Sequence, residues 1–476
     1  MKLNELTLTN PYLQLPAEFY DKVVPTPLAD PYLIHANPDV AKILDIDEEE
    51  LQSDTFVKFL NGEYLARGSE PFAMCYAGHQ FGQFVPRLGD GRAINIGTLG
   101  KYHLQLKGAG MTVYSRHGDG RAVLRSSIRE YLMSEAMQGL SIPTTLCLGL
   151  IGSEHQVRRQ EIEKGAIVCR VSSSWVRFGT FEYYAHQGMF EELKALADYV
   201  IDENFPHIKG REDHYTLLFN EAMVITARLM AQWMSVGFNH GVMNTDNMSI
   251  AGLTIDYGPY AFLDDFRHDH VCNQTDVHGR YSFSNQPEIA KWNLKSLMMA
   301  LSPLTTMEKL EKNLAIYDKI YMRYFHYYMC KKLGFEGTVE GDPELIDDML
   351  DMLESLQVDY TLFFRTLSHY EGDRNALLAT GLYHEPMHAW LDRYDERIKH
   401  IDATERKEQM LSTNPKYVLK NYMLQEAIDA AEQGDFSVVD DLFKIAQDPF
   451  DEHPEFERWA GATPKEFKNR KLSCSS

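Results

Sequence analysis

The sequence predicts an α+β protein in which a β-rich first half is followed by a helical second half. Short alternating or β-branched runs, separated by glycines, fill residues 89–174. From about residue 186, apolar residues recur at helical spacing over long stretches. The chain has 476 residues, of which 44% are hydrophobic and 24% charged, so it can bury a large core.

The charge balance and the cysteines exclude several classes of protein. With 47 Lys and Arg against 69 Asp and Glu, the formal net charge is −22, whereas a protein that coats nucleic acid needs an excess of cations. No stretch approaches the roughly 18 apolar residues of a membrane span, and the N-terminus does not resemble a signal peptide. The six cysteines are scattered without a CxxC pair. We therefore expect a cytoplasmic protein of bacterial type, with a mitochondrial location only if the chain is eukaryotic.

The elements of the first half follow in order. Residues 1–70 are rich in proline and indicate an irregular arm with short helices. Ala93–Leu99 and Tyr102–Lys107, separated by Gly100, are typical of a hairpin, and Ala122–Gly139 has the apolar spacing of a helix. Further strands are expected at Thr145–Ile151, His155–Arg159 and Ala166–Ser173.

The second half is mainly helical. A long helix is expected at Tyr215–Val236, before Gly237, and it is followed by a polar loop, His240–Asn247. A short hairpin is expected next, from Met248–Ile250 into Leu253–Ile255. Later helices are expected at Lys291–Leu301, Met307–Lys332, Pro343–Leu367 and Tyr417–Gln433. The expected segments are an N-terminal extension (1–70), a β-rich lobe (71–180), a helical lobe (181–435) and a C-terminal tail (436–476).

The most informative local pattern is Asp246-Asn247 followed by Asp256-Tyr257-Gly258. Amide and carboxylate oxygens from Asn247 and Asp256 are ligands that suit Mg²⁺ when nucleotide phosphates complete its shell. Asp246 is placed to accept a proton from an attacking hydroxyl. The alternative is a pair of polar turns without a ligand.

The β-rich half supplies a second pattern. Lys107 ends a predicted strand and Glu130 lies in the helix that follows, which is how protein kinases hold the lysine that contacts nucleotide phosphates. Leu88–Arg92, with Gly89 and Gly91, favours either a loop around a nucleotide or a simple hairpin turn. A solvated surface charge is the alternative for the lysine and the glutamate.

Two arginines and a histidine-rich segment complete the candidates. Arg170 and Arg177 have guanidinium groups suited to phosphate oxygens, or alternatively to ion pairs between lobes. The segment with His268, His270, Cys272 and His278 fits no standard zinc spacing.

These motifs, in this order, resemble the selenoprotein O family over most of the chain. The resemblance rests on Tyr76–Gly82, Leu88–Arg92, Gln105–Gly110, Tyr114–Arg116, Asp119–Glu130, His240–Ser249, Gln286–Pro287, Trp292–Leu294, Asn414–Leu419 and Cys474–Ser476. It implies a protein-kinase-like two-lobed fold that transfers AMP from ATP, with Mg²⁺ or Mn²⁺, to Ser, Thr or Tyr hydroxyls of proteins; the family's activity extends to UMP. It also implies a nucleotide bound flipped relative to ordinary kinases.

The resemblance assigns roles to individual residues. Asp246 matches the proton acceptor, Asn247 and Asp256 the metal ligands, and Glu130 the partner of Lys107. The implied nucleotide contacts are Gly89, Gly91, Arg92, Lys107, Asp119, Gly120, Arg170, Arg177 and Asp256. Because an aspartate repels phosphate, we expect Asp119 to bind the base or to organise Arg116 and Arg121.

Two features refine this interpretation. Kinase catalytic loops place an aspartate directly after His-Arg or His-Gly, but here Val242 follows Gly241, and the nearest carboxylate is Asp246. A displaced base favours attack at another phosphorus, although a phosphotransferase and an inactive nucleotide-binding pseudokinase remain alternatives. Cys474 stands where some relatives carry selenocysteine, and our hypothesis is a reversible Cys272–Cys474 disulfide that regulates the site.

Overall fold

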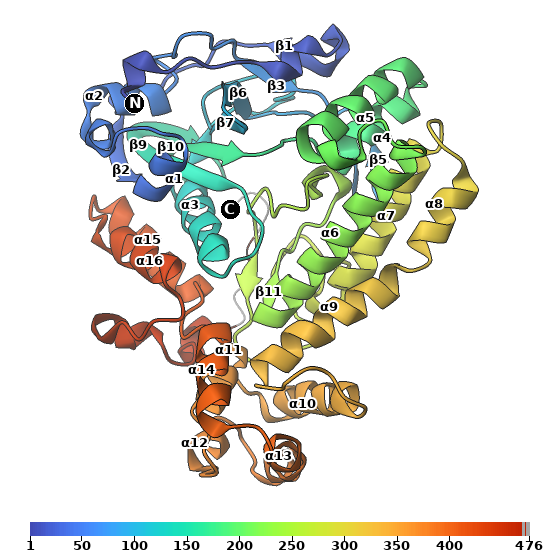
Figure 1. The fold of residues 1–476 in the computed structure, drawn as a ribbon. Coiled ribbons are helices and arrows are strands. Elements are labelled where there is room, and N and C mark those ends of the chain that lie inside the picture. The colour runs from blue at the N-terminus through green and yellow to red at the C-terminus, as the bar shows by residue number, and fades with distance from the viewer. Residues whose placement is uncertain (469–471, 473–476) are drawn as a thin grey trace.

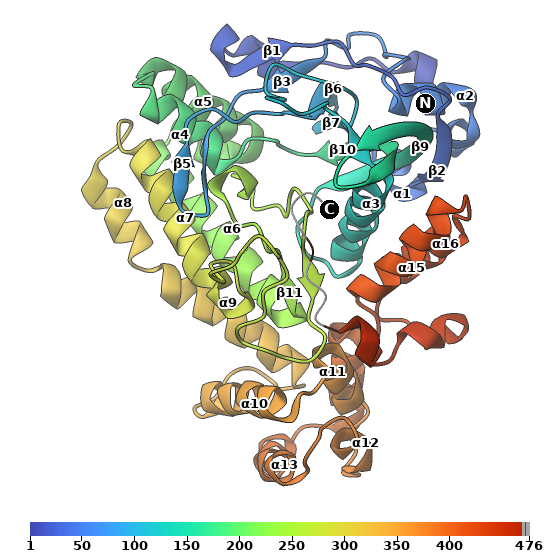
Figure 2. The ribbon, with the colours of Figure 1, turned by 180° about the vertical axis from the view of Figure 1, so that it is seen from behind.

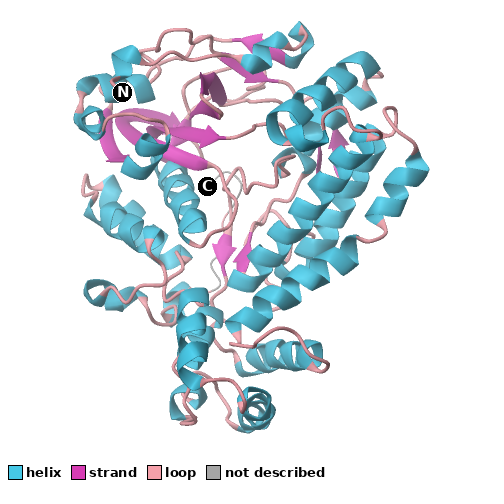
Figure 3. Ribbon diagram, viewed as in Figure 1, coloured by secondary structure: helices cyan, strands magenta, loops and turns pink. Residues whose placement is uncertain are grey.

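The computed structural model describes residues 1–468 and 472, and its main feature is an antiparallel sheet (Figure 1, Figure 3). The strand order is β1-β3-β6-β7-β10-β9-β2, with β8 paired to β10. These strands are β1 Tyr20–Lys22, β2 Tyr32–Ala36, β3 Phe72–Met74, β6 Ala93–Leu99, β7 Tyr102–Lys107, β8 Ala122–Val123, β9 Leu146–Arg158 and β10 Ile162–Ser172. Two small sheets pair β4 (Gly78–Gln80) with β5 (Gln83–Val85) and β11 (Phe238–Asn239) with β12 (Ala261–Phe262).

The predicted hairpin of β6 and β7 is confirmed, and its register places Ala93 opposite Lys107. The prediction of separate strands at Thr145–Ile151 and His155–Arg159 is wrong, because β9 runs through both. A bulge opposite Lys164 and Gly165 takes up the extra residues of β9. A bulge lets a strand continue where the sequence pattern breaks.

The N-terminal arm contributes more than the expected short helices. Its two strands, β1 and β2, pair with β3 and β9, at the two ends of the main sheet. They have three and five residues and lie among prolines, so the sequence shows no strand pattern there. Helices α1 and α2 lie in the same arm (Figure 1).

Helices dominate the chain after β10. Figure 2 shows α6, α7 and α9 side by side, on the opposite side of the molecule from α15 and α16. The helices are α1 Pro38–Ile43, α2 Asp54–Leu60, α3 Leu124–Gly139, α4 Phe178–His186, α5 Phe190–Asn204, α6 His214–Val236, α7 Gln286–Leu301, α8 Met307–Leu314, α9 Tyr317–Lys332, α10 Asp342–Leu356, α11 Tyr360–Ser368, α12 Asn375–Leu378, α13 Glu385–Ile398, α14 Ala403–Thr413, α15 Asn421–Glu432 and α16 Ser437–Gln447. Among the described residues, none of these helices is both long enough and apolar enough to cross a bilayer.

Three predicted elements of the second half also differ from the observed ones. Met307–Lys332 is two helices, α8 and α9, and Pro343–Leu367 is also two, because Gln357 adopts a left-handed conformation (φ 53°) that ends α10. The hairpin expected between Met248 and Ile255 is wrong. That segment forms only isolated bridges to other parts of the chain, and the neighbouring two-stranded sheet is β11 with β12.

The C-terminal helices complete the core around α3. Helix α16 packs against α3, and its Phe443 ring lies 5.7 Å from Tyr131 of α3 and 4.4 Å from His35 of β2. Helix α15 packs on both α16 and α3. The helix that carries Glu130 is thus fixed between the sheet and the C-terminal helices.

Lys332, at the end of α9, is a buried cation that we expect to destabilise the fold at neutral pH. Its side chain lies over Phe364, with Nζ 4.1 Å from the ring centroid, and burial lowers its pKa to about 7. A lysine in the unfolded chain has a pKa near 10.4. Burial therefore makes the protonated side chain less stable in the folded state than in the unfolded state, which lowers the free energy of unfolding. The penalty is full below pH 7 and disappears as the pH rises towards 10.

Lys332→Met should therefore raise the free energy of unfolding at pH 7 by about 2 kcal/mol. Chemical denaturation at pH 7 and at pH 9.5 measures this gain, which should be clearly smaller at the higher pH. An equal gain at both pH values would show that the effect comes from packing and not from charge.

Candidate active site

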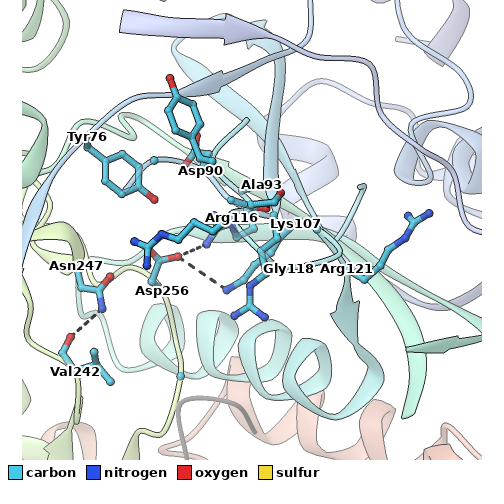
Figure 4. A pocket seen from close by; sticks show the side chains of 18 of the residues that line it. Tyr76, Asp90, Ala93, Lys107, Arg116, Gly118, Arg121, Val242, Asn247 and Asp256 are labelled. Atoms are coloured by element: carbon cyan, nitrogen blue, oxygen red, sulfur yellow. Dashed lines mark hydrogen bonds and ion pairs between the residues drawn. The ribbon is translucent and has the colours of Figure 1, made fainter. Parts of the chain in front are cut away.

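One pocket of about 610 Å³ lies between the main sheet and the segment from Val242 to Pro259 (Figure 4). It contains every residue that the sequence predicts to contact the nucleotide or a metal. These residues are Gly89, Gly91, Arg92, Lys107, Asp119, Gly120, Arg170, Arg177, Asn247 and Asp256. The fold brings them together from strands β7 and β10 and from four loops.

Asp256 is bound by cations on both oxygens. Arg170 Nη1 donates to Oδ1 at 2.6 Å and Arg177 Nη1 donates to Oδ2 at 2.7 Å, while Lys107 Nζ lies 3.9 Å from Oδ1. Burial alone would raise the pKa of Asp256, but Arg177, Arg170 and Lys107 outweigh it and hold the pKa well below its usual value. The carboxylate is therefore ionised at neutral pH.

Glu130 holds two of these cations from behind the pocket. Its Oε2 lies 2.5 Å from Lys107 Nζ, and its Oε1 accepts from Arg170 Nη1 at 2.9 Å. Burial lowers the pKa of Lys107, and the nearby Glu130 opposes that shift. Glu130 comes from α3, so the rigid packing of α3 fixes the direction of both cations.

Asn247 and Asp246 point to different places. Asn247 Nδ2 donates to the Val242 carbonyl at 3.0 Å, so its amide oxygen is the end left for a ligand (Figure 4). The Asp246 side chain does not line the pocket but lies against β4, where Oδ2 accepts from Gln80 Nε2 at 3.3 Å. Its Oδ1 is buried without a hydrogen-bond partner among the described residues, and a Cβ on Gly78 would come within 2.5 Å of it.

Burial raises the pKa of Asp246 to about 7, although Arg177 partly opposes this effect. Arg177 also donates from Nη1 to the main-chain oxygen of Asp246 at 2.8 Å. One guanidinium thus joins the loop of Asp246 to the carboxylate of Asp256.

Asp119 pairs with a residue that the sequence analysis did not single out. Its carboxylate accepts from both terminal nitrogens of Arg159, at 2.8 and 3.0 Å, and from the Arg121 main-chain N at 2.9 Å. Of the two arginines that Asp119 was expected to organise, Arg121 binds it through the main chain only, since the Arg121 guanidinium binds the Thr26 and Gly108 carbonyls. Among the described residues, no hydrogen bond or ion pair joins Asp119 to Arg116. Side-chain bonds from Asp119 go to Arg159.

Two glycine positions explain the close packing of the pocket loops. A Cβ on Gly89 (φ 97°) would lie 2.3 Å from the Tyr114 ring, and one on Gly120 (φ 68°) would lie 2.1 Å from the Gly110 carbonyl. Both backbones occupy the left-handed region, which favours glycine. A side chain at either position would push the loops apart.

The pocket is strongly basic within an acidic protein. Its cations outnumber its carboxylates, although the whole chain carries −22. The cationic lining residues are Arg92, Lys107, Arg116, Arg121, Arg159, Arg170 and Arg177, against Asp90, Asp119 and Asp256. Sequence analysis missed Arg159, which no motif marks, and it gave no pocket role to Tyr76 and Tyr114, although both lie in motifs of the family resemblance.

The oxygen donors of Asn247 and Asp256 fit a hard divalent cation. Both side chains line the same pocket, and Asp256 carries the negative charge that such a cation needs. Within residues 1–468 and 472 there is no cluster of three or more His, Cys, Asp or Glu side chains suited to a metal. A cation here would take its remaining ligands from phosphates and water.

The proposed cysteine pair falls partly outside the described residues, because Cys474 lies there. Cys272 is buried, and its main chain pairs with the C-terminal segment: Leu472 N donates to the Cys272 carbonyl at 3.0 Å. Gln274 N in turn donates to the Leu472 carbonyl at 2.7 Å.

Comparisons with known proteins show the family of the chain. The family model described as "Protein adenylyltransferase SelO" matches residues 2–447. The "Protein nucleotidyltransferase YdiU" of Myxococcus xanthus is 47% identical over 100% of this chain and 99% of its own length. Proteins of the same name from Photobacterium profundum and Aliivibrio fischeri are 43% and 44% identical, over 100% and 99% of this chain and 99% of their own lengths. The resemblance found in the sequence is confirmed, and the chain belongs to the SelO family.

Proposed function

We propose that the chain transfers AMP from ATP to Ser, Thr or Tyr hydroxyls of proteins, and that UTP serves as a second donor for UMP. The observation that carries this proposal is the basic pocket around the ionised Asp256. A pocket with this excess of cations in an acidic protein is complementary to a nucleoside triphosphate bound with a metal. The family and the names of the relatives support transfer of a nucleotide to protein.

The proposal includes a kinase-like arrangement of two lobes. A strand lysine, Lys107, is held by a helix glutamate, Glu130, on the sheet side of the pocket. Asn247 and Asp256 lie on the opposite side, in the segment between helix α6 and helix α7. This order of the parts along the chain supports a placement of nucleotide and metal like that in protein kinases.

In this proposal, Asn247 and Asp256 hold Mg²⁺ or Mn²⁺, which supplies positive charge to the triphosphate. Lys107, Arg170 and Arg177 bind phosphate oxygens and stabilise the charge that develops during transfer. Because Glu130 and Asp256 already orient these cations, their geometry is set before the nucleotide binds.

Asp246 accepts the proton of the acceptor hydroxyl. The hydroxyl oxygen forms a bond to the α-phosphorus, the bond to the bridging oxygen between the α- and β-phosphates breaks, and pyrophosphate leaves. Val242 occupies the place of the kinase base and cannot take a proton, which favours this displaced carboxylate over ordinary phosphotransfer. Because Asp246 lies against β4, its use as a base requires that the Gln80 contact opens.

A Cys272–Cys474 disulfide is the proposed redox control. It is supported by the backbone pairing of Leu472, two residues before Cys474, with Cys272 and Gln274. Transfer by Cys474→Ser enzyme should be equal under oxidising and reducing conditions, whereas the unaltered enzyme should differ between them. Equal activity of the unaltered enzyme in both conditions would remove this proposal.

Labelled ATP tests the function directly. Incubation of the chain with protein acceptors and ATP labelled at the α-phosphate should label protein and release pyrophosphate. Label that reaches protein from the γ-phosphate would instead show a kinase. No label from either position, with ATP still bound, would show an inactive nucleotide-binding protein.

A further inference from the structure

A second pocket of about 540 Å³ lies between the β4–β5 hairpin, α4 and α7. Figure 1 and Figure 2 both show β5 beside these two helices. Four rings line the pocket: His79, Phe84, His186 and Trp292. The His79 ring centroid lies 5.1 Å from those of Phe84 and Trp292, and the Phe84 centroid lies 4.4 Å from that of His186. Such a pocket suits a large apolar side chain.

The pocket continues along α7 as a groove. A neighbouring hollow of about 660 Å³, between α7 and α8, shares Trp292 and Lys295 with the first. Met299, which is 55% exposed, adds an apolar surface at the rim. The two hollows together are lined by α7 residues from Glu288 to Ala300, a span that suits an extended polypeptide better than a small molecule. Lys295 forms no ion pair with any residue that the structure describes, so its ammonium group can bind a carboxylate of a ligand.

Hydrogen bonds join this groove to the loop that carries Asp246. His79 Nδ1 lies 2.5 Å from Glu182 Oε1, and Glu182 Oε2 accepts from Thr245 Oγ1. The main-chain N of His79 also donates to Thr245 Oγ1, at 2.6 Å. Thr245 directly precedes Asp246. A polypeptide in the groove would therefore contact His79 and Glu182, which both bind the residue that directly precedes Asp246.

We propose that this groove binds the acceptor protein. The ring-lined pocket takes a large apolar side chain close in sequence to the modified hydroxyl, and Lys295 binds an acidic residue beside it. This inference rests on the proposed function, which requires that a polypeptide reach Asp246. It adds the surface that recognises this polypeptide. Continuity with the Asp246 loop distinguishes this groove from other apolar hollows on the molecule.

The test uses peptide libraries with a central Tyr, Ser or Thr, in which each flanking position is varied in turn, together with α-labelled ATP. The unaltered chain should label peptides with an aromatic or large aliphatic residue at one flanking position about tenfold better than those with alanine there. Met299→Glu places a charge at the exposed rim without disturbing the core, and Trp292→Ala removes a pocket wall. Both variants should lose the preference and keep the dissociation constant for ATP.

Tyr327→Ala is the matched control, because Tyr327 is an exposed aromatic residue on α9, outside the groove, and this variant should keep the preference. Peptide labelling without a positional preference, or the same preference in Met299→Glu and Trp292→Ala, would overturn the inference alone. No labelling of any peptide, together with no ATP binding in calorimetry, would overturn the proposed function as well.

Discussion

Asp256→Ala should lower the rate of nucleotide transfer by about 10³-fold or more. The substitution removes a proposed metal ligand and leaves Arg170 and Arg177, both fully buried, facing each other without their shared carboxylate. Initial rates with α-labelled ATP measure this loss. Because an unpaired buried charge typically costs about 3–5 kcal/mol, the thermal unfolding midpoint should also fall.

Two further variants separate the loss of activity from the loss of stability. Asp256→Asn keeps the shape of the side chain and should fold better than Asp256→Ala while staying inactive. Asp351→Ala removes an exposed aspartate of α10 and should change neither quantity. Normal metal-dependent transfer by Asp256→Asn would show that Asp256 is not a metal ligand.

Asp246→Asn should lower kcat by about 10²- to 10⁴-fold, because it removes the group that takes the proton from the acceptor hydroxyl. Since this side chain does not line the nucleotide pocket, the dissociation constant for ATP should remain within about twofold of the original. Single-turnover rates and calorimetry measure the two quantities separately.

Gly78→Ala is a useful companion to this variant. Its Cβ would come 2.5 Å from Asp246 Oδ1 and push the carboxylate from its place without removing it. We expect a smaller loss of kcat than for Asp246→Asn. A loss confined to ATP affinity in both variants would contradict the role given to Asp246.

Part of the predicted site is held by regular structure, whereas the glycine loops, Asn247 and Asp256 lie between strands and α-helices. Lys107 and Glu130 lie on a strand and a helix with clear periodicity, and the structure brings them together at 2.5 Å. Arg170 and Arg177 come from β10 and the start of α4, and both reach Asp256. Strand and helix patterns fix where such side chains point, so spacing carries the information.

The missed features depend on contacts between segments far apart in the chain. Arg159 lies at the tip of the β9–β10 hairpin and reaches Asp119, 40 residues away. The β4–β5 hairpin that covers Asp246 has strands of three residues each, too short to show a period. The end of α10 at Gln357 has no glycine or proline to mark it. No local pattern encodes these contacts.

The most direct measurement is a crystal structure of the chain with Mn²⁺ and a non-hydrolysable ATP analogue. We expect an anomalous Mn²⁺ peak within about 2.2 Å of the Asn247 amide oxygen and of an Asp256 carboxylate oxygen, with the triphosphate among Lys107, Arg170 and Arg177. A metal bound elsewhere, or a nucleotide outside this pocket, would contradict the site and the chemistry proposed for it.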